Sequence, residues 1–186
     1  DAVRIAVGID HGGDRDANDL IGTAPVRDLP LYVWQAATSA IMAGCKPEYF
    51  PVVLATWEAM FEPQFNIHTM LTSTSGPAIA GIVSGPYAQA IGMNSGTGML
   101  GPGNRANATI GRAIRIGAMT ALKAIPSSLD QATFGHAGKY TYHFAEGMPP
   151  AGWPTARELL GFSSLDTTVT VMAADAPHQI AHRWAP

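Results

Sequence analysis

The sequence predicts an α/β or α+β fold: a single layered domain over residues 1–186, with a mixed sheet flanked by helices. Short β-branched apolar runs alternate with amphipathic helical segments along the chain, which is the pattern of a layered domain. A length of 186 residues suits one domain or one compact subunit. The chain shows neither an internal repeat nor a long linker, so nothing in the sequence divides it.

Each predicted element rests on a local pattern. Runs rich in β-branched and apolar residues, bounded by Gly, Pro or Ser, predict short strands. Segments with apolar residues at helical spacing, opened by a capping residue or a proline, predict helices. The predicted strands are residues 3–9, 66–72, 78–83, 140–145 and 167–173, and the predicted helices are residues 28–42, 48–61, 86–91 and 104–124.

The first two predicted helices are joined by a short turn that contains the only cysteine. Asp28 is interpreted as the start of the first helix, and Gly44 ends it. Pro47 then starts the second helix. Cys45 and Lys46 therefore lie in the turn between the two helices.

The composition excludes several classes of protein. With a net charge of −3, the chain lacks the clustered basic residues that a nucleic-acid-binding surface needs. It has no apolar run of about 18 residues or more, as a membrane-spanning helix requires, and its first residues are not a signal peptide. The single cysteine excludes an internal disulfide and a cysteine-rich metal or iron–sulfur site, and it favours a cytoplasmic protein.

The scarcity of charge predicts a protein partner. Charged residues make up only 13% of the chain, about half the usual share of a globular domain. A surface of this kind is often covered by another protein, so we expect a subunit of an oligomer. The first residue is Asp rather than Met, and we therefore expect one subunit or a processed part of a larger assembly.

A glycine-rich turn opens directly onto the predicted helix at 104–124. Five glycines lie between residues 92 and 103, and a helix that starts in such a turn presents backbone N–H groups that favour an anion. Gly103, Asn104 and Arg105 would then surround an anionic group of a ligand. The dinucleotide fingerprint and the P-loop lysine are both missing, so no nucleotide or flavin site is predicted. The alternative is a turn with a structural role only.

Cys45 has two interpretations that the sequence leaves open. A free cysteine is most often a buried small hydrophobic residue. However, Cys45 directly precedes Lys46 and a helix that starts at a proline, and both an ammonium group and a helix N-terminus lower the pKa of a thiol. In the second interpretation Cys45 is a nucleophilic thiolate.

A second group of reactive side chains lies between residues 135 and 146. This stretch contains His, Lys, Tyr and Glu, which are the common proton-transfer groups. His136 and Lys139 lie in a turn next to glycines, just before the predicted strand at 140–145. The alternative is a solvated loop followed by an ordinary strand.

Other histidines permit a metal ion without requiring one. The acidic loop near the N-terminus departs from the calcium-loop pattern and is more typical of a polar surface loop. One histidine pair has i, i+4 spacing but no evident third ligand. The candidates are Asp10, His11, Asp14, Asp16 and Asp19 in the loop, the pair His178 and His182, and His68 in a predicted strand, which either belongs to the core or points into the site.

Three segments carry a resemblance to a known family. They are Met-Ala-Gly-Cys-Lys-Pro-Glu-Tyr-Phe-Pro-Val-Val at 42–53, Asn-Ser-Gly at 94–96 joined to Gly-Pro-Gly-Asn-Arg-Ala-Asn-Ala-Thr-Ile-Gly-Arg-Ala at 101–113, and Gly-His-Ala-Gly-Lys-Tyr at 135–140. Together they resemble a poorly characterised bacterial family associated with UGSC-motif domains, in which a cysteine or selenocysteine lies in a Cys/Sec-Gly-Ser-Cys loop. Its members are sometimes labelled thiol-disulfide or thioredoxin-like. The resemblance covers about residues 35–182.

The resemblance implies a set of site residues but no settled reaction. This chain departs from the family pattern because it has no Cys-Gly-Ser-Cys loop, so a thiol–selenol relay would need a partner protein. The family pattern also continues beyond the point where this chain stops. The matching positions are Cys45, Glu48, Asn94, Ser95, Arg105, Asn107, His136, Lys139 and Tyr140.

The residues and the resemblance together predict one subunit of a hetero-oligomeric enzyme, of the hydrolase or lyase type, that acts on a small polar or anionic molecule. Cys45 would act as nucleophile with Glu48 nearby, while His136 and Lys139 would act as acid/base and charge stabiliser. The predicted substrate-binding residues are Asn94, Ser95, Gly103, Asn104, Arg105, Asn107 and Tyr140.

Two rival functions stay open. In the first, Cys45 and a histidine, either His68 or His136, bind a metal ion. The sequence shows no nucleotide or flavin motif and otherwise leaves the cofactor unknown. In the second, the chain is a structural subunit whose glycine-rich turn completes the site of a partner.

Overall fold

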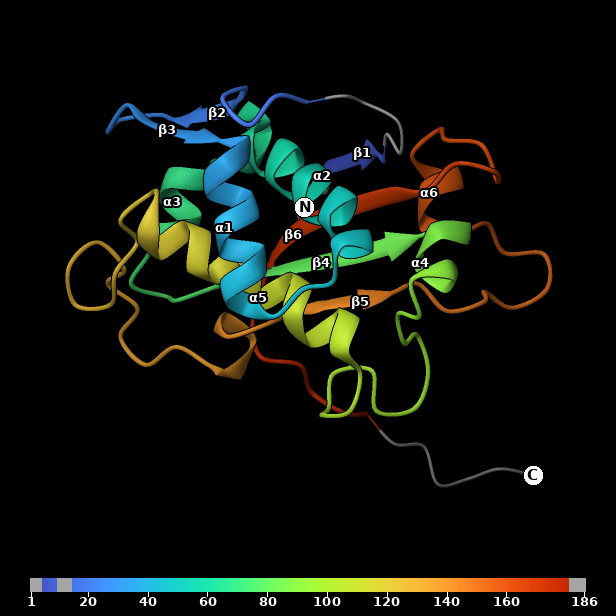
Figure 1. Cartoon of the computed structure of the whole chain (residues 1–186). Helices are drawn as coiled ribbons and strands as arrows, with labels where there is room; N and C mark the ends of the chain where they lie inside the picture. Colours follow the sequence, from blue (N-terminus) through green and yellow to red (C-terminus); the bar gives the residue numbers. More distant parts are fainter. Residues whose placement is uncertain (1–4, 10–14, 181–186) are drawn as a thin grey trace.

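The computed structural model describes residues 5–9 and 15–180 and contains a mixed sheet (Figure 1). The strand order in this four-stranded sheet is β1 (Ile5–Gly8), β6 (Thr168–Ala174), β4 (Ala78–Ser84) and β5 (His143–Ala145). Strand β6 runs antiparallel to β1 and β4, whereas β4 and β5 are parallel. The mixed sheet and the helices that accompany it confirm the predicted α/β class.

Three helices form a layer against one face of the sheet (Figure 1). Helix α2 (Phe50–Phe61) packs on β1 and β6, and α5 (Arg105–Thr120) packs on β5. Helix α1 (Val33–Ala43) packs mainly on α5 and also on α2. Because α5 contacts both the sheet and α1, it occupies the centre of the fold.

Smaller elements surround this core. Helices α4 and α6 lie at the carboxyl end of β4 (Figure 1). Among the described residues, no helix is long and apolar enough to cross a lipid bilayer. The smaller elements are the hairpin of β2 (Leu20–Ala24) and β3 (Leu29–Tyr32), the helices α3 (Ile67–Thr72), α4 (Pro86–Ala90) and α6 (Ala156–Leu159), and the 3₁₀ helices η1 (Pro47–Tyr49), η2 (Pro63–Phe65) and η3 (Ala137–Lys139).

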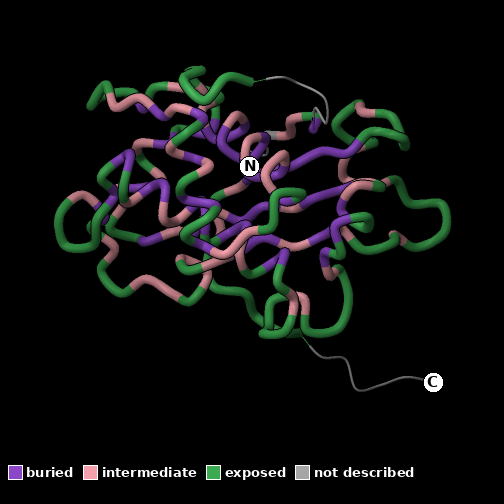
Figure 2. Tube along the Cα trace, viewed as in Figure 1, coloured by how far each residue is buried: buried purple, intermediate pink, exposed green. Residues whose placement is uncertain are grey.

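The two faces of the sheet differ in burial. Val83 pairs with Val169 across β4 and β6, and both side chains are fully buried toward the helices. Residues one position along each strand point to the opposite face. There, Phe144 and Met172 are only partly buried. The buried segments in Figure 2 accordingly follow the strands and the helices that cover one face.

Small residues let α5 approach its neighbours closely, as its sequence predicts. Ala106, Ala113 and Ala118 are buried, although Ala108 is exposed. A Cβ atom added to Gly111 would lie 2.8 Å from the backbone nitrogen of Tyr142, which is too close for any larger residue. The distance between α5 and the segment before β5 is therefore set by this glycine.

The strand predicted at 66–72 is wrong, because residues 67–72 form α3. Asn66 lies in the left-handed region and caps the helix, with its side chain accepting a hydrogen bond from Thr69 N at 3.4 Å. The local capping geometry therefore outweighs the β-branched composition that suggested a strand.

The helix predicted to start at Asp28 begins five residues later, at Val33. Residues 29–32 form β3 instead, paired with a strand β2 that the sequence did not indicate. Pro30 is tolerated there because this two-stranded sheet has only edge strands. The strand predicted at 140–145 is also shorter, because Tyr140 N bonds to Ala137 O and ends η3.

His143 is buried in the layer between the sheet and α5. Its ring approaches Gly81 of β4 and Gly111 of α5 so closely that a Cβ atom on either residue would meet it. The Thr56 hydroxyl, which donates to Val52 O at 2.7 Å, lies 3.5 Å from His143 Nε2. His143 Nδ1 is buried without a hydrogen-bond partner among the described residues. Burial accordingly lowers the pKa of His143 to about 4.

This buried histidine predicts that stability falls as the pH is lowered from about 6.5 to about 4. In that range the unfolded chain binds a proton at His143 and the folded chain does not. The free energy of unfolding should decrease by up to roughly 3 kcal/mol through this residue alone. Denaturant titrations at several pH values should show this slope for the natural chain and a shallower slope for His143→Gln.

The matched control is His178→Gln, which removes an exposed histidine and should keep the slope of the natural chain. Proton NMR of the His143 ring gives a second readout that needs no variant. A ring that titrates near pH 6.5 in the folded protein contradicts the prediction.

Candidate functional site

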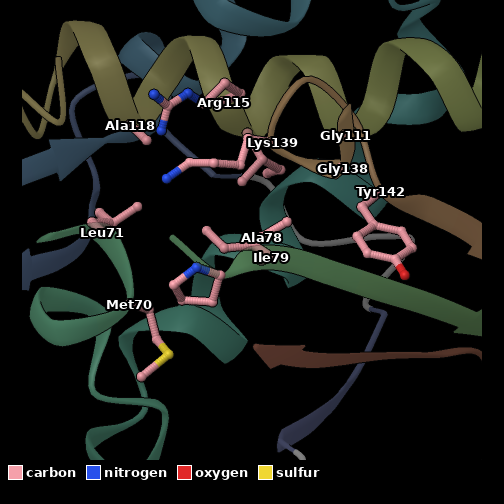
Figure 3. Close-up of a pocket in the computed structure, with 12 residues that line it drawn as sticks. Met70, Leu71, Ala78, Ile79, Gly111, Arg115, Ala118, Gly138, Lys139 and Tyr142 are labelled. Carbon is pink, nitrogen blue, oxygen red and sulfur yellow. The ribbon is translucent and has the colours of Figure 1, made fainter. Parts of the chain in front are cut away.

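The best-defined cluster of charged side chains joins α5 to the loop at 126–140. Asp130 Oδ2 accepts a hydrogen bond from Arg115 Nη2 at 2.8 Å, and Asp130 Oδ1 accepts one from Lys139 Nζ, also at 2.8 Å. The side chain of Asp130 is 3% exposed, and those of Arg115 and Lys139 are 17% and 15% exposed. Figure 3 shows Arg115 on α5 with Lys139 beside it.

The charge of this cluster follows from the surroundings of Asp130. Burial raises the pKa of Asp130, but hydrogen bonds from Lys139, from the backbone N–H of Ala132 and from Arg115 outweigh burial and hold the pKa below its usual value. The carboxylate is therefore ionised at neutral pH. Two cations against one anion leave a net charge of +1.

A cavity of about 500 Å³ opens beside this cluster. Such a volume lies within the range of about 300–1,000 Å³ that is typical of small-molecule sites. A second, much smaller cavity of about 30 Å³ lies on the apolar side of Arg115 and Lys139 (Figure 3). The larger cavity is lined by Arg115, Met119, Pro126, Ser127, Asp130, Ala132, Phe134, Gly135, His136, Lys139 and Tyr140.

His136 lines this cavity, but backbone groups engage both nitrogens of its ring. Gly138 N donates to His136 Nδ1 at 3.2 Å. The ring proton must therefore lie on Nε2, which donates to Ala174 O at 3.3 Å. The ring also packs edge-on against Tyr142, with centroids 6.2 Å apart. His136 is thus held as a fixed wall of the cavity.

Cys45 lies outside this cavity. Burial raises the pKa of its thiol, while a hydrogen bond with Thr109 and the charge of Arg105 lower it less. Lys46, which the sequence suggested as an activating charge, lies 3.6 Å from Glu48 in an ion pair. The structure therefore favours a neutral thiol at Cys45 over the nucleophilic thiolate of the second interpretation.

The glycine-rich turn uses its asparagines to hold its own backbone. Asn104 caps α5 by accepting from Asn107 N at 2.9 Å and donates to Gly92 O at 2.7 Å. Asn107 Nδ2 donates to Asn94 O at 2.9 Å and to Met99 O at 3.0 Å. Arg105 Nε donates to Gly44 O at 3.0 Å and so ties the turn to the end of α1. These bonds favour a structural role for the turn.

Helix α5 separates the two predicted clusters. Thr109, which contacts Cys45, precedes Arg115 by six residues on α5. This spacing corresponds to about 9 Å along the helix axis and about 120° around it. The structure thus places His136, Lys139 and Tyr140 at one cavity and Cys45, Glu48 and Arg105 elsewhere. Asn94, Ser95, Gly103, Asn104 and Asn107 do not line this cavity either.

Arg115 and Asp130 are the residues that sequence reasoning missed. Arg115 lies between Ile114 and Ile116, and Asp130 has no other charged residue between 124 and 138. An isolated charge among apolar and small residues was the available signal, because such a charge needs a partner when it is buried.

The predicted metal candidates do not gather in the structure. His68 lies on α3, and the side chains of Asp16 and Asp19 form a local turn. His178 is exposed in a segment that is not helical. Across 5–9 and 15–180, no three His, Cys, Asp or Glu side chains are grouped so that they could hold a metal ion. Asp10, His11, Asp14 and His182 lie outside the described residues.

Comparison with known proteins adds no relative. No family model matches the chain. No curated protein sequence and no solved structure matches it either. The resemblance to the family associated with UGSC-motif domains therefore stays a prediction.

The ion pairs of Asp130 predict a specific loss of stability in Asp130→Asn. The substitution leaves two largely buried cations without a counter-charge, which should lower the free energy of unfolding by roughly 2–4 kcal/mol at pH 7. Because the pKa of Asp130 is lowered on folding, its contribution is present above the ordinary value of 3.8 and is lost as the pH falls further. Chemical denaturation at pH 7 and pH 3 measures both effects.

Asp28→Asn is the matched control, because Asp28 is exposed and Asn also tolerates its positive φ. It should change the unfolding free energy by less than about 0.5 kcal/mol. If both substitutions lower the free energy of unfolding equally, the ion pairs of Asp130 do not stabilise the fold and the prediction is wrong.

Proposed function

We propose that this chain binds a small anionic molecule in the cavity beside Lys139, as the substrate-binding subunit of a hetero-oligomeric enzyme of the hydrolase or lyase type. The observation that carries the proposal is the net positive charge that Arg115 and Lys139 hold, nearly buried, at the base of this cavity. We also propose a cytoplasmic location, because the single cysteine suits a reducing compartment.

The hydrogen-bond inventory of the cluster supports an anionic ligand. Asp130 already accepts bonds from Arg115, Lys139 and Ala132 N. An ammonium group has three N–H donors and a guanidinium group has five, and each side chain gives only one in its bond to Asp130. The cavity therefore offers donors rather than acceptors, which is what a carboxylate or a phosphate needs.

The same residues suggest how the chain would contribute to a reaction. Lys139 would stabilise negative charge that develops on the substrate. Tyr140, whose side chain ends in a hydroxyl group, also lines the cavity. Because Cys45 lies on another side of α5, a nucleophile for a ligand in this cavity would be water or a group of the partner subunit.

The exposed side of α1 supports a partner subunit. Trp34, Ile41 and Met42 are exposed, and α1 contains no charged residue. Exposed aromatic and aliphatic side chains without charge are typical of the centre of a protein interface. The same observation supports the second candidate function, a non-catalytic subunit that completes the site of its partner.

The anion proposal predicts a specific effect of Lys139→Gln. Calorimetric titration of the chain with acetate and with inorganic phosphate should show binding that Lys139→Gln weakens by about tenfold or more, because a charge-assisted hydrogen bond contributes roughly 1.5–3 kcal/mol. Lys46→Gln removes an exposed lysine that does not line the cavity and should leave both affinities unchanged. If neither anion binds, or if both variants weaken binding alike, the proposal is wrong.

The partner proposal predicts that the chain alone lacks turnover. Size-exclusion chromatography of the chain, alone and with its co-purifying protein, should give activity only in the larger species. Ile41→Lys should prevent co-elution, because it places a charge in the proposed interface, and should leave anion binding intact. The control is Leu165→Lys, at an exposed leucine of the loop before β6. An active monomer contradicts the proposal.

A further inference from the structure

The cavity beside Lys139 has a charged base and an aromatic rim. Arg115 and Lys139 lie at the base, where Asp130 holds them. Phe134 and Tyr140 also line the cavity, but their residues are 100% and 75% exposed. A ligand in this cavity therefore meets two different kinds of surface.

The exposed Phe134 is carried on a fixed backbone. The preceding residue, Thr133, donates its N–H to Thr74 O at 2.9 Å, and Ala132 N donates to Asp130 Oδ1 at 3.1 Å. Ala132 also packs so tightly on Gly76 that an added Cβ on this glycine would lie 2.8 Å from the Ala132 Cβ. The backbone that carries Phe134 is thus held beside the cavity, while the phenyl ring is exposed. Covering such a ring removes apolar surface from water and is favourable.

The charge of the base indicates the anionic group. Arg115, Lys139 and Asp130 together carry a net charge of +1 at neutral pH. A carboxylate neutralises this charge with its single negative charge, whereas a phosphate monoester carries about two. The planar guanidinium group also matches the planar carboxylate.

We propose that the ligand of this cavity is an aromatic carboxylate, whose charged group lies on Arg115 and Lys139 and whose ring lies against Phe134 and Tyr140. This assignment rests on the proposed function, because it requires that the cavity binds an anion. It goes further in naming the chemical class: a carboxylate joined by a short linker to an aromatic ring. The cavity volume of about 500 Å³ has room for such a molecule.

The test compares four small molecules by calorimetric titration of the full chain: phenylacetate, acetate, 2-phenylethanol and phenyl phosphate. Phenylacetate should bind at least about tenfold more tightly than acetate, because its ring covers apolar surface at Phe134. It should also bind more tightly than 2-phenylethanol, which lacks the charge, and than phenyl phosphate, which carries excess charge. Phenylacetate binding should protect the Phe134 ring from solvent in aromatic NMR spectra.

Two variants separate the ring from the charge. Phe134→Ala should weaken phenylacetate binding by about tenfold and leave acetate binding unchanged. Trp153→Ala is the matched control, since Trp153 is an exposed aromatic residue that does not line the cavity, and it should change neither affinity. Both residues are exposed, so the variants should fold.

The outcomes distinguish the inference from the proposed function. If acetate binds as tightly as phenylacetate, or if Phe134→Ala has no effect, the aromatic assignment is wrong and the anion site remains. If phenyl phosphate binds most tightly, the carboxylate assignment is wrong. If no anion binds, the proposed function and the inference are both wrong.

Discussion

The close approach of α5 to the chain around residues 141–143 is the constraint on which the rest of the structure depends. Gly111 leaves no room for a side chain between the helix and Tyr142 N. The approach buries His143 between α5 and β4 and fixes the start of β5. About one turn further along α5, it brings Arg115 within reach of Asp130 and Lys139. The proposed anion site is thus a consequence of helix–sheet packing.

Much of the fold could be predicted from the sequence because its main elements carry strong local signals. The β-branched runs predict β4 and β6, and the apolar spacing predicts α2 and α5, all to within a few residues of their bounds in the structure. The wrong predictions concern segments whose secondary structure depends on distant contacts or on helix caps. Asn66 turned a β-branched run into α3, and β2 could be recognised only with its partner β3. Neither effect is visible in periodicity alone.

The candidate site was harder to predict than the fold. Local chemistry singled out His136, Lys139 and Tyr140, and these residues do line one cavity. Local chemistry could not indicate that Cys45 lies on a different side of α5 from this cavity. It also missed Asp130, because the sequence does not show that folding brings Arg115 and Lys139 into contact with this isolated aspartate. Asparagines in the glycine-rich turn likewise bond to that turn's own backbone rather than remaining available to a ligand.

The arrangement of donors around Asp130 links affinity to order in the loop. The same carboxylate that keeps Arg115 and Lys139 in position also fastens the segment at 130–139 to α5. An anion that draws either cation away from Asp130 loosens this fastening, and by reciprocity a looser fastening changes the affinity for the anion. Arg115 and Lys139 each have N–H donors beyond the one given to Asp130, so Asp130 and a bound anion would share these two side chains. If the cavity binds an anion as proposed, the strength with which Asp130 fastens this loop to α5 depends on whether the cavity is occupied.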